Sequence, residues 1–247
     1  MFENRHILVF HQTSDRYYPG INNIKPGNFW ALCVLLQRWG YIFLQGNHEE
    51  EPGGKGIVIS FDDGYRDNFD VLMELAERDI KPLVFIPTAF TGKTNSWEYS
   101  SGFFKASHLN ESEIKDLSRA GIIFGSHGHS HRALTGLDIK TLKSELLESR
   151  ERIEDITGKT VNYISFPFGR TNRKINEVAQ ECGYKIGFIM DDPVSETGFI
   201  KPRIPVYSLD NIFSLKTRLV GNPLEKFKNR VISRLSSGTI ILSGDLK

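Results

Sequence analysis

Two short strings in the sequence carry residue types that can perform hydrolytic chemistry. The first, Ser60–Gly64, reads Ser-Phe-Asp-Asp-Gly and supplies two adjacent carboxylates. The second, Gly125–His131, reads Gly-Ser-His-Gly-His-Ser-His and supplies imidazoles four residues apart. Two imidazoles and one carboxylate, with the remaining positions left to water, suit a catalytic Zn²⁺ or a similar divalent metal. The other carboxylate then remains as a candidate base for activating water.

The spacing within each string allows more than one local geometry. In an extended chain Asp62 and Asp63 would point to opposite sides, so that one could bind a metal while the other faces a substrate. On a helical turn His127 and His131 would share a face and His129 would point away. In an extended strand all three imidazoles would share a face. The structural alternatives are an Asp-Asp-Gly turn at a strand end and a polar loop with unconnected histidines.

Apolar, β-rich runs alternate with amphipathic helical patterns along the chain. We expect strands at residues 7–10, 57–61, 83–86, 122–124, 163–166, 186–189 and 239–242. We expect helices at residues 29–40, 68–79, 111–120, 139–157, 172–181 and 223–235. This alternation favours an α/β fold, either a parallel sheet or a barrel of βα units. No linker-like stretch interrupts it, so we expect a single domain over residues 1–247.

The reactive side chains all fall directly after expected strands. Asp62 and Asp63 follow the second strand, and His127 follows the fourth. Phe168 follows the fifth strand and His11 follows the first. Since reactive groups of α/β barrels gather at the carboxyl ends of the strands, we expect these residues to meet at one end of the barrel.

Composition excludes several other classes of protein. The 247 residues include 31 Lys plus Arg and 30 Asp plus Glu, which gives a net charge of +1 and no support for nucleic-acid binding. The two cysteines form no Cys-x-x-Cys pair. No stretch has the length of a membrane span, and the first residues lack a signal peptide. We therefore expect no integral membrane segment and a cytoplasmic location.

The two strings resemble the first and second motifs of the NodB-homology polysaccharide deacetylases, carbohydrate esterase family 4. That family carries a Thr/Ser-Phe-Asp-Asp-Gly motif and a His-x-x-x-His motif. The resemblance implies a distorted (β/α) barrel of about seven parallel strands. It also implies that Asp62 is the general base and that Asp63, His127 and His131 hold a divalent metal. Zn²⁺ is the first expectation, with Co²⁺ or Ni²⁺ as alternatives.

The third family motif, an Arg-x-Pro-Tyr-Gly-like string, is altered here to Ser165–Gly169, or Ser-Phe-Pro-Phe-Gly. The resemblance implies that the backbone N–H of Phe168 helps to bind the oxyanion, a role that survives the change from Tyr to Phe. A simple turn is the alternative. The family's Arg orients the base, and Arg203 or Arg170 could replace it here, although a surface ion pair is the default reading of either residue.

The last family motif, Leu-x-His near the C-terminus, supplies the general acid. The expected strand at residues 239–242 carries no histidine, whereas the run Ile7–His11 ends in one. This arrangement resembles the circularly permuted poly-N-acetylglucosamine deacetylases, in which this strand and its histidine come first. The resemblance implies that His11 is the general acid. A strand-end histidine with a structural hydrogen bond is the alternative.

The resemblance implies a metal-dependent hydrolase that removes N-acetyl groups from an N-acetylhexosamine-containing glycan and releases acetate. One alternative is a deformylase or deacylase of a small lipid- or nucleotide-linked amino sugar, and another is a non-catalytic carbohydrate-binding relic. Aromatic residues in loops are candidates for stacking on sugar rings: Tyr17, Tyr18, Trp97, Tyr99, Phe103 and Phe104. The sequence leaves the metal, the acyl group, the polymer length and the oligomeric state open.

Overall fold

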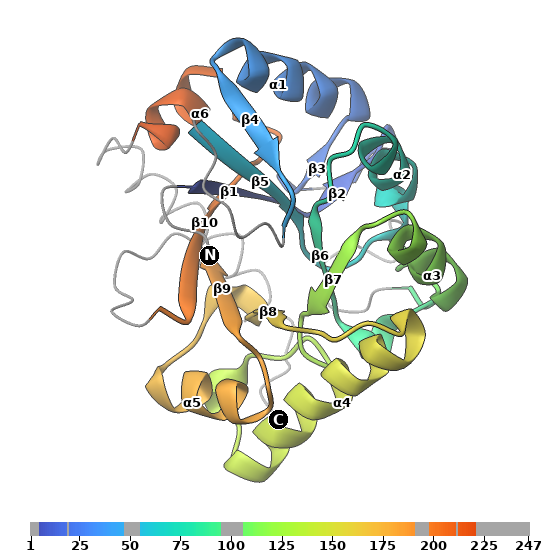
Figure 1. The fold of residues 1–247 in the computed structure, drawn as a ribbon, viewed down its shortest axis with the longest axis vertical. Coiled ribbons are helices and arrows are strands. Elements are labelled where there is room, and N and C mark those ends of the chain that lie inside the picture. Colours follow the sequence, from blue (N-terminus) through green and yellow to red (C-terminus); the bar gives the residue numbers. More distant parts are fainter. Residues whose placement is uncertain are drawn as a thin grey trace.

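A closed ring of parallel strands forms the centre of the molecule (Figure 1). A computed structural model of the chain describes residues 5–18, 20–46, 55–94, 106–190, 198–210 and 212–220. The strands of the ring are, in order, β1 (Arg5–Phe10), β5 (Lys55–Phe61), β6 (Leu83–Ile86), β7 (Ile123–Ser126), β8 (Tyr163–Ser165), β9 (Ile186–Met190) and β10 (Ile200–Pro205). Strand β1 pairs in parallel with both β5 and β10, which closes the ring. The predicted (β/α) barrel is confirmed.

Helices surround the strands on the outside (Figure 1). They are α1 (Pro26–Arg38), α2 (Phe69–Glu77), α3 (Glu111–Arg119), α4 (Ile139–Thr157), α5 (Arg173–Glu181) and α6 (Ile212–Leu219). Strand β4 (Tyr41–Leu44) adds to β5 outside the ring, and β2 (Gln12–Thr13) pairs with β3 (Asn23–Ile24) as a separate two-stranded sheet. The barrel is distorted because β7 and β8 share a single residue pair, Ser126 with Ile164.

The alternation of side chains along the strands separates two apolar clusters. Ile7, Val58 and Phe85 belong to a small cluster that fills the barrel, together with Phe188 of β9. Their strand neighbours belong to a larger cluster that includes the apolar faces of the helices, such as Leu146 of α4. Successive residues of a strand point to opposite faces, so continuously apolar strands can be buried on both sides.

Most expected elements are present within the described residues, with bounds that shift by a few positions. The expected strand at 83–86 and the expected helix at 139–157 coincide with β6 and α4. Strand β10 was not expected, because Lys201, Pro202 and Arg203 interrupt its apolar pattern. The expected helix at 223–235 and strand at 239–242 lie outside the described residues, so a single domain over 1–247 stays a prediction.

The helices of the described residues are too short or too polar to cross a bilayer.

Candidate active site

The reactive residues meet where the parallel strands end. Strands β1 and β5 run in register, with Phe10 opposite Phe61, so His11 and Asp62 follow neighbouring strand ends. The Asp62 N–H donates to the Phe10 carbonyl at 2.9 Å and continues this pairing by one residue. Residues from distant parts of the chain are therefore brought together by the sheet itself, as expected for the carboxyl end of a barrel.

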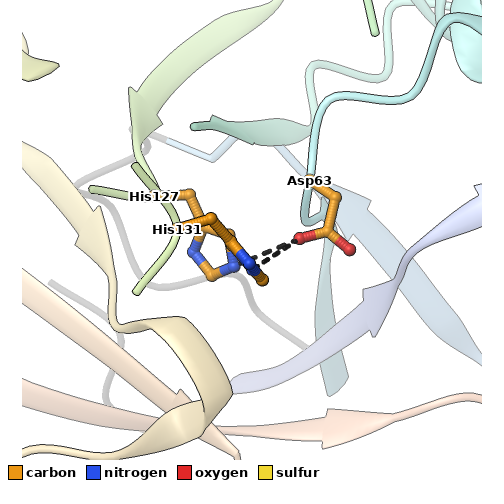
Figure 2. Close-up of side chains that lie close together, drawn as sticks. All are labelled: Asp63, His127 and His131. Carbon is orange, nitrogen blue, oxygen red and sulfur yellow. Dashed lines mark ion pairs between the residues drawn. The ribbon is translucent and has the colours of Figure 1, made fainter. Parts of the chain in front are cut away.

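Asp63, His127 and His131 form a compact cluster of potential metal ligands. One carboxylate oxygen of Asp63 lies 3.3 Å from His127 Nε2 and 3.2 Å from His131 Nε2. Figure 2 shows both imidazoles directed at that oxygen. All three residues are buried, and their ligand atoms lie within 4.8 Å of one another. Such a set of two imidazoles and one carboxylate fits a divalent metal of the Zn²⁺ type.

Neither the helical turn nor the extended strand considered for residues 127–131 is present. Strand β7 ends at Ser126, and residues 127–131 form an irregular loop. Gly128, with φ of 74°, and His131, with φ of 55°, turn the backbone so that the two imidazoles converge. Of the two geometries considered for Asp62 and Asp63, the extended chain does not continue through Asp63, whose φ is 66°. Glycine adopts this left-handed conformation freely, whereas Asp63 and His131 adopt it at a cost of about 1–3 kcal/mol each.

Hydrogen bonds from two imidazoles fix the geometry around the cluster. His127 Nδ1 donates to the Ser165 carbonyl at 2.7 Å, which turns Nε2 towards Asp63. His108 Nδ1 donates to the Asp63 carbonyl at 2.7 Å and supports its left-handed backbone. Burial lowers the pKa of His108 to about 4, so this imidazole stays neutral near pH 7. Hydrogen bonds of this kind orient metal-binding residues in proteins.

The electrostatics of the cluster favour an ionised carboxylate. Burial alone would raise the pKa of Asp63, but hydrogen bonds from His127 and His131 hold it well below the ordinary value of 3.8. Burial likewise opposes the charged form of His127, but the Asp62 and Asp63 carboxylates outweigh it and raise the pKa of His127. Burial lowers the pKa of His131. The cluster thus offers an anionic carboxylate, the form that binds cations.

Asp62 belongs to a second, adjoining network. Arg203 Nη1 and Nη2 donate to the two Asp62 carboxylate oxygens at 2.7 Å each, which makes a bidentate ion pair. Both side chains are 1% exposed. Ser165 Oγ donates to Asp62 at 3.1 Å and accepts from Arg203 at 2.7 Å. Burial alone would raise the pKa of Asp62, but the Arg203 charge outweighs it and holds the pKa below 3.8.

Arg203 therefore occupies a buried position rather than the surface expected by default. It reaches Asp62 from β10, and its guanidinium carbon lies 5.2 Å from the ring centroid of Phe85 and 5.7 Å from that of Phe188. Arg170, the other residue named as a replacement for the family arginine, is exposed. Ser165, at the position of that arginine, completes the network, a contribution that the sequence alone did not indicate.

His11 lies beside these carboxylates. The residue is buried, and within the described part of the chain its Nδ1 has no hydrogen-bond partner. The charge on His11 would contribute to the lowered pKa values of Asp62 and Asp63, which places the imidazole within electrostatic reach of both. Asn68 Nδ2 donates to the His11 carbonyl at 2.7 Å and, with its Oδ1, accepts from the N–H and hydroxyl of Thr13. This clamp was missed because Asn68 was expected only to begin a helix.

Phe168 contacts the cluster, whereas His129 does not take part in it. The Phe168 ring packs edge-on against His131 with centroids 5.0 Å apart, and its φ of 60° is left-handed. His129 faces away from the cluster, with Nδ1 hydrogen-bonded to Thr88 Oγ1 at 2.9 Å and Nε2 3.8 Å from Glu148. Of the loop aromatics, Tyr17 is exposed and Tyr18 is partly buried, while Trp97, Tyr99, Phe103 and Phe104 lie outside the described residues.

Comparison with known proteins agrees with this geometry. Residues 49–187, more than half of the chain, match the family model described as polysaccharide deacetylase. The chain belongs to the polysaccharide deacetylase family. Its sequence is 29% identical over 140 residues to YxkH of Bacillus subtilis, an alignment that covers 56% of this chain and 46% of YxkH. The chain thus spans about half the length of that relative.

Two solved structures share the fold over nearly their whole length. PplD of Streptococcus pyogenes, solved in complex with acetate, has a TM-score of 0.72 at 20% identity, covering 87% of this chain and 97% of PplD. IcaB of Ammonifex degensii has a TM-score of 0.74 at 16% identity, covering 88% of this chain and 96% of IcaB. At such identities the likeness concerns the fold.

The buried ion pair generates a prediction about stability. Replacing Arg203→Met leaves the Asp62 carboxylate buried without its partner, and the free energy of unfolding should fall by about 3–5 kcal/mol at neutral pH. In the wild-type protein the pKa of Asp62 is lowered, so its ionised form stabilises the folded state. This contribution is complete above the ordinary carboxyl pKa of 3.8 and is lost as the pH falls below that value. In the variant without Arg203, burial raises the pKa of Asp62, so acid protonates the carboxylate and removes the unpaired charge. The difference in free energy of unfolding between variant and wild type should therefore become smaller as the pH falls. Urea unfolding measured from about pH 4 to about pH 7, a range that begins near the ordinary carboxyl pKa, tests both effects.

Arg173→Met is the matched control, because Arg173 pairs with Glu177 on the surface, where the two side chains are 93% and 55% exposed. Its loss should leave the free energy of unfolding almost unchanged, because an exposed ion pair is screened by water. Equal destabilisation by the two substitutions would contradict the importance of the buried pair.

Proposed function

We propose that the protein is a metal-dependent N-deacetylase of glycans that contain N-acetylhexosamine. The observation that carries the proposal is the position of the Asp62–Arg203 pair directly beside the Asp63, His127 and His131 cluster. A ligand set for a cation and a separate oriented carboxylate are the two parts that hydrolysis of an unactivated amide requires.

Asp63, His127 and His131 would hold the cation, and Asp62 would act as the general base. When bound, a divalent cation supplies Lewis acidity that polarises an acyl oxygen and acidifies water. Arg203 keeps Asp62 ionised and fixes its orientation through both carboxylate oxygens. Asp62 can then remove a proton from water as the water oxygen attacks the amide carbon.

The remaining steps use groups that flank the cluster. The Phe168 N–H would donate to the oxyanion of the tetrahedral intermediate, and its left-handed backbone fixes the direction of that donor. His11 would donate a proton to the leaving nitrogen as the carbon–nitrogen bond breaks. The oxygen of water thus ends in acetate, and the leaving nitrogen gains a proton and becomes a free amine. The proton that Asp62 takes up balances the proton that His11 gives.

A second candidate is hydrolysis of a small N-acyl or N-formyl amino sugar linked to a lipid or nucleotide. It uses the same residues in the same roles and differs only in the substrate. The non-catalytic alternative is less consistent with the site, because a binding protein has no need for the buried Asp62–Arg203 pair next to three metal ligands.

The direct test is acetate release from N-acetylglucosamine oligomers by the purified protein. We expect release that stops after treatment with a chelator and returns on addition of Zn²⁺ or Co²⁺. A protein that binds zinc but releases no acetate from any oligomer would contradict the glycan assignment. Formate release from an N-formyl amino sugar under the same conditions would then favour the second candidate.

Asp62→Asn separates the base from the metal ligands. The variant should keep the zinc stoichiometry of the wild type and lose turnover by about 10²-fold or more, as is typical on loss of a general base. His127→Ala serves as the comparison, since it removes a ligand and should lose the metal itself. Full turnover by Asp62→Asn would reject the assigned base.

His11→Ala tests the assigned proton donor through the leaving group. Hydrolysis of the N-acetyl amide should fall by about 10²–10⁴-fold, because an amine must be protonated as it leaves. Hydrolysis of 4-nitrophenyl acetate should fall by less than about threefold, because its phenolate leaves without a proton. An equal loss on both substrates would show that His11 acts on the structure of the site instead.

A further inference from the structure

The loop that carries the two histidine ligands is held from outside by one carboxylate. Between His127 and His131, the N–H groups of His129 and Ser130 both donate to Glu145 Oε2, at 3.0 and 2.8 Å. The Ser130 hydroxyl donates to the other oxygen, Oε1, at 2.5 Å. Glu145 thus accepts three hydrogen bonds from two consecutive residues that lie between the ligands.

Several other backbone groups of the loop also have hydrogen-bond partners. The Gly128 N–H donates to Ser126 Oγ at 3.0 Å, and that hydroxyl lies 2.8 Å from Ser149 Oγ of α4. On the opposite side the His129 carbonyl accepts from the Ala89 N–H at 2.9 Å. Helix α4 and the loop after β6 therefore hold the histidine loop between them, and Glu145 makes the largest share of these bonds.

The groups around Glu145 show that its carboxylate is paired mainly with the histidine loop. The side chain is 9% exposed, and the nearest cation in the described residues, Arg132 Nε, lies 3.9 Å away, beyond hydrogen-bond distance. Backbone N–H groups and a hydroxyl are consequently the main partners of this buried carboxylate. Charge-assisted hydrogen bonds of this kind are shorter and stronger than neutral ones and fix geometry.

The loop needs such support because the left-handed backbone of His131 is strained. Gly128 and His131 both have positive φ, and along this path His127 Nε2 and His131 Nε2 both reach the same oxygen of Asp63 (Figure 2). A loop released from Glu145 would have two free N–H groups and could relax away from this conformation. The two imidazoles would then be less well arranged for a shared cation.

We propose that Glu145 is a positioning residue that sets the metal affinity of the site by holding the His127–His131 loop in its ligand-presenting conformation. This inference rests on the metal site of the proposed function. Glu145 itself touches neither ligand imidazole nor substrate. It acts through the loop backbone, in the manner of the outer groups that orient metal ligands elsewhere.

Helix α4 offers a matched control in Glu148, which lies about one turn further along. Its side chain is 54% exposed and approaches the loop only through the His129 imidazole, at 3.8 Å. Glu148→Gln therefore changes the charge of the same helix close to the same loop without removing a backbone contact. A general effect of helix charge would appear in both variants, whereas loss of loop support would appear only in Glu145→Gln.

The experiment measures the zinc dissociation constant of each purified variant by competition with a chromophoric chelator. Glu145→Gln should weaken zinc binding by about 10–100-fold, the usual effect of removing an outer group of a metal site. Glu148→Gln should stay within about twofold of the wild type, as expected for an exposed charge. The visible spectrum of the Co²⁺-loaded protein should change in Glu145→Gln alone, which reports ligand geometry independently of activity.

Thermal unfolding of the metal-free variants accompanies these measurements. Where Glu145→Gln fails to fold, Ser130→Ala replaces it, because this substitution removes the bond to Oε1 and leaves both backbone bonds in place; it should weaken zinc binding by a smaller factor. An unchanged dissociation constant and Co²⁺ spectrum in a folded Glu145→Gln protein would overturn the inference, as would a wild-type protein that binds no zinc.

These outcomes differ from failure of the proposed function. Wild-type protein that binds zinc without releasing acetate would contradict the deacetylase assignment, while a weakened affinity in Glu145→Gln would still support the role of Glu145. Conversely, chelator-sensitive acetate release with unchanged affinity in Glu145→Gln would contradict only the role of Glu145.

Discussion

The site depends above all on the buried ion pair between Asp62 and Arg203. Both side chains are almost completely withdrawn from water, and a buried charge is strongly destabilising without a partner. The pair joins the end of β5 to β10 across the barrel, and Ser165 attaches β8 to the same network. This one ion pair consequently orients the carboxylate assigned as the base and also joins the strands around the barrel interior. Aromatic rings of Phe85 and Phe188 line the guanidinium and exclude water from it.

Local sequence was informative wherever function depends on neighbouring residues. The Asp62–Asp63 pair and the spacing of His127 and His131 indicated the cluster of potential metal ligands, since strand ends place such residues at one edge of a barrel. The strand–helix alternation likewise predicted the fold class, because continuously apolar strands and one-sided helices have different periods. These features are encoded within a few residues of one another.

Contacts across the barrel were harder to predict. Arg203 lies 141 residues from Asp62, in a strand whose proline and charges hid its β character. The conformation of the histidine loop could not be predicted from the spacing either. Gly128 and His131 adopt a left-handed backbone conformation that occurs in neither a regular helix nor a strand. Glu145 and Asn68 escaped notice for the same reason, since hydrogen bonds from a helix to a distant loop leave no periodic signal in the sequence.

The match to the family spans residues 49–187, yet two groups beside the site lie outside that range. His11 precedes it and Arg203 follows it, and their strands β1 and β10 pair with each other to close the barrel. The segment that matches the family therefore carries the cluster of potential metal ligands. The flanking strands contribute a buried imidazole and the partner of Asp62. A fragment limited to the matched range would lack both strands and could not form the closed ring.

Four residues other than glycine adopt a left-handed backbone in the described part of the chain, and three of them, Asp63, His131 and Phe168, belong to the site. Each conformation carries an energetic cost that a glycine would remove. Selection for thermal robustness alone would thus favour changes at the very positions that hold the reactive groups. The chain retains conformational strain in its proposed active site, so laboratory evolution towards higher stability would need a simultaneous screen for activity to keep that site intact.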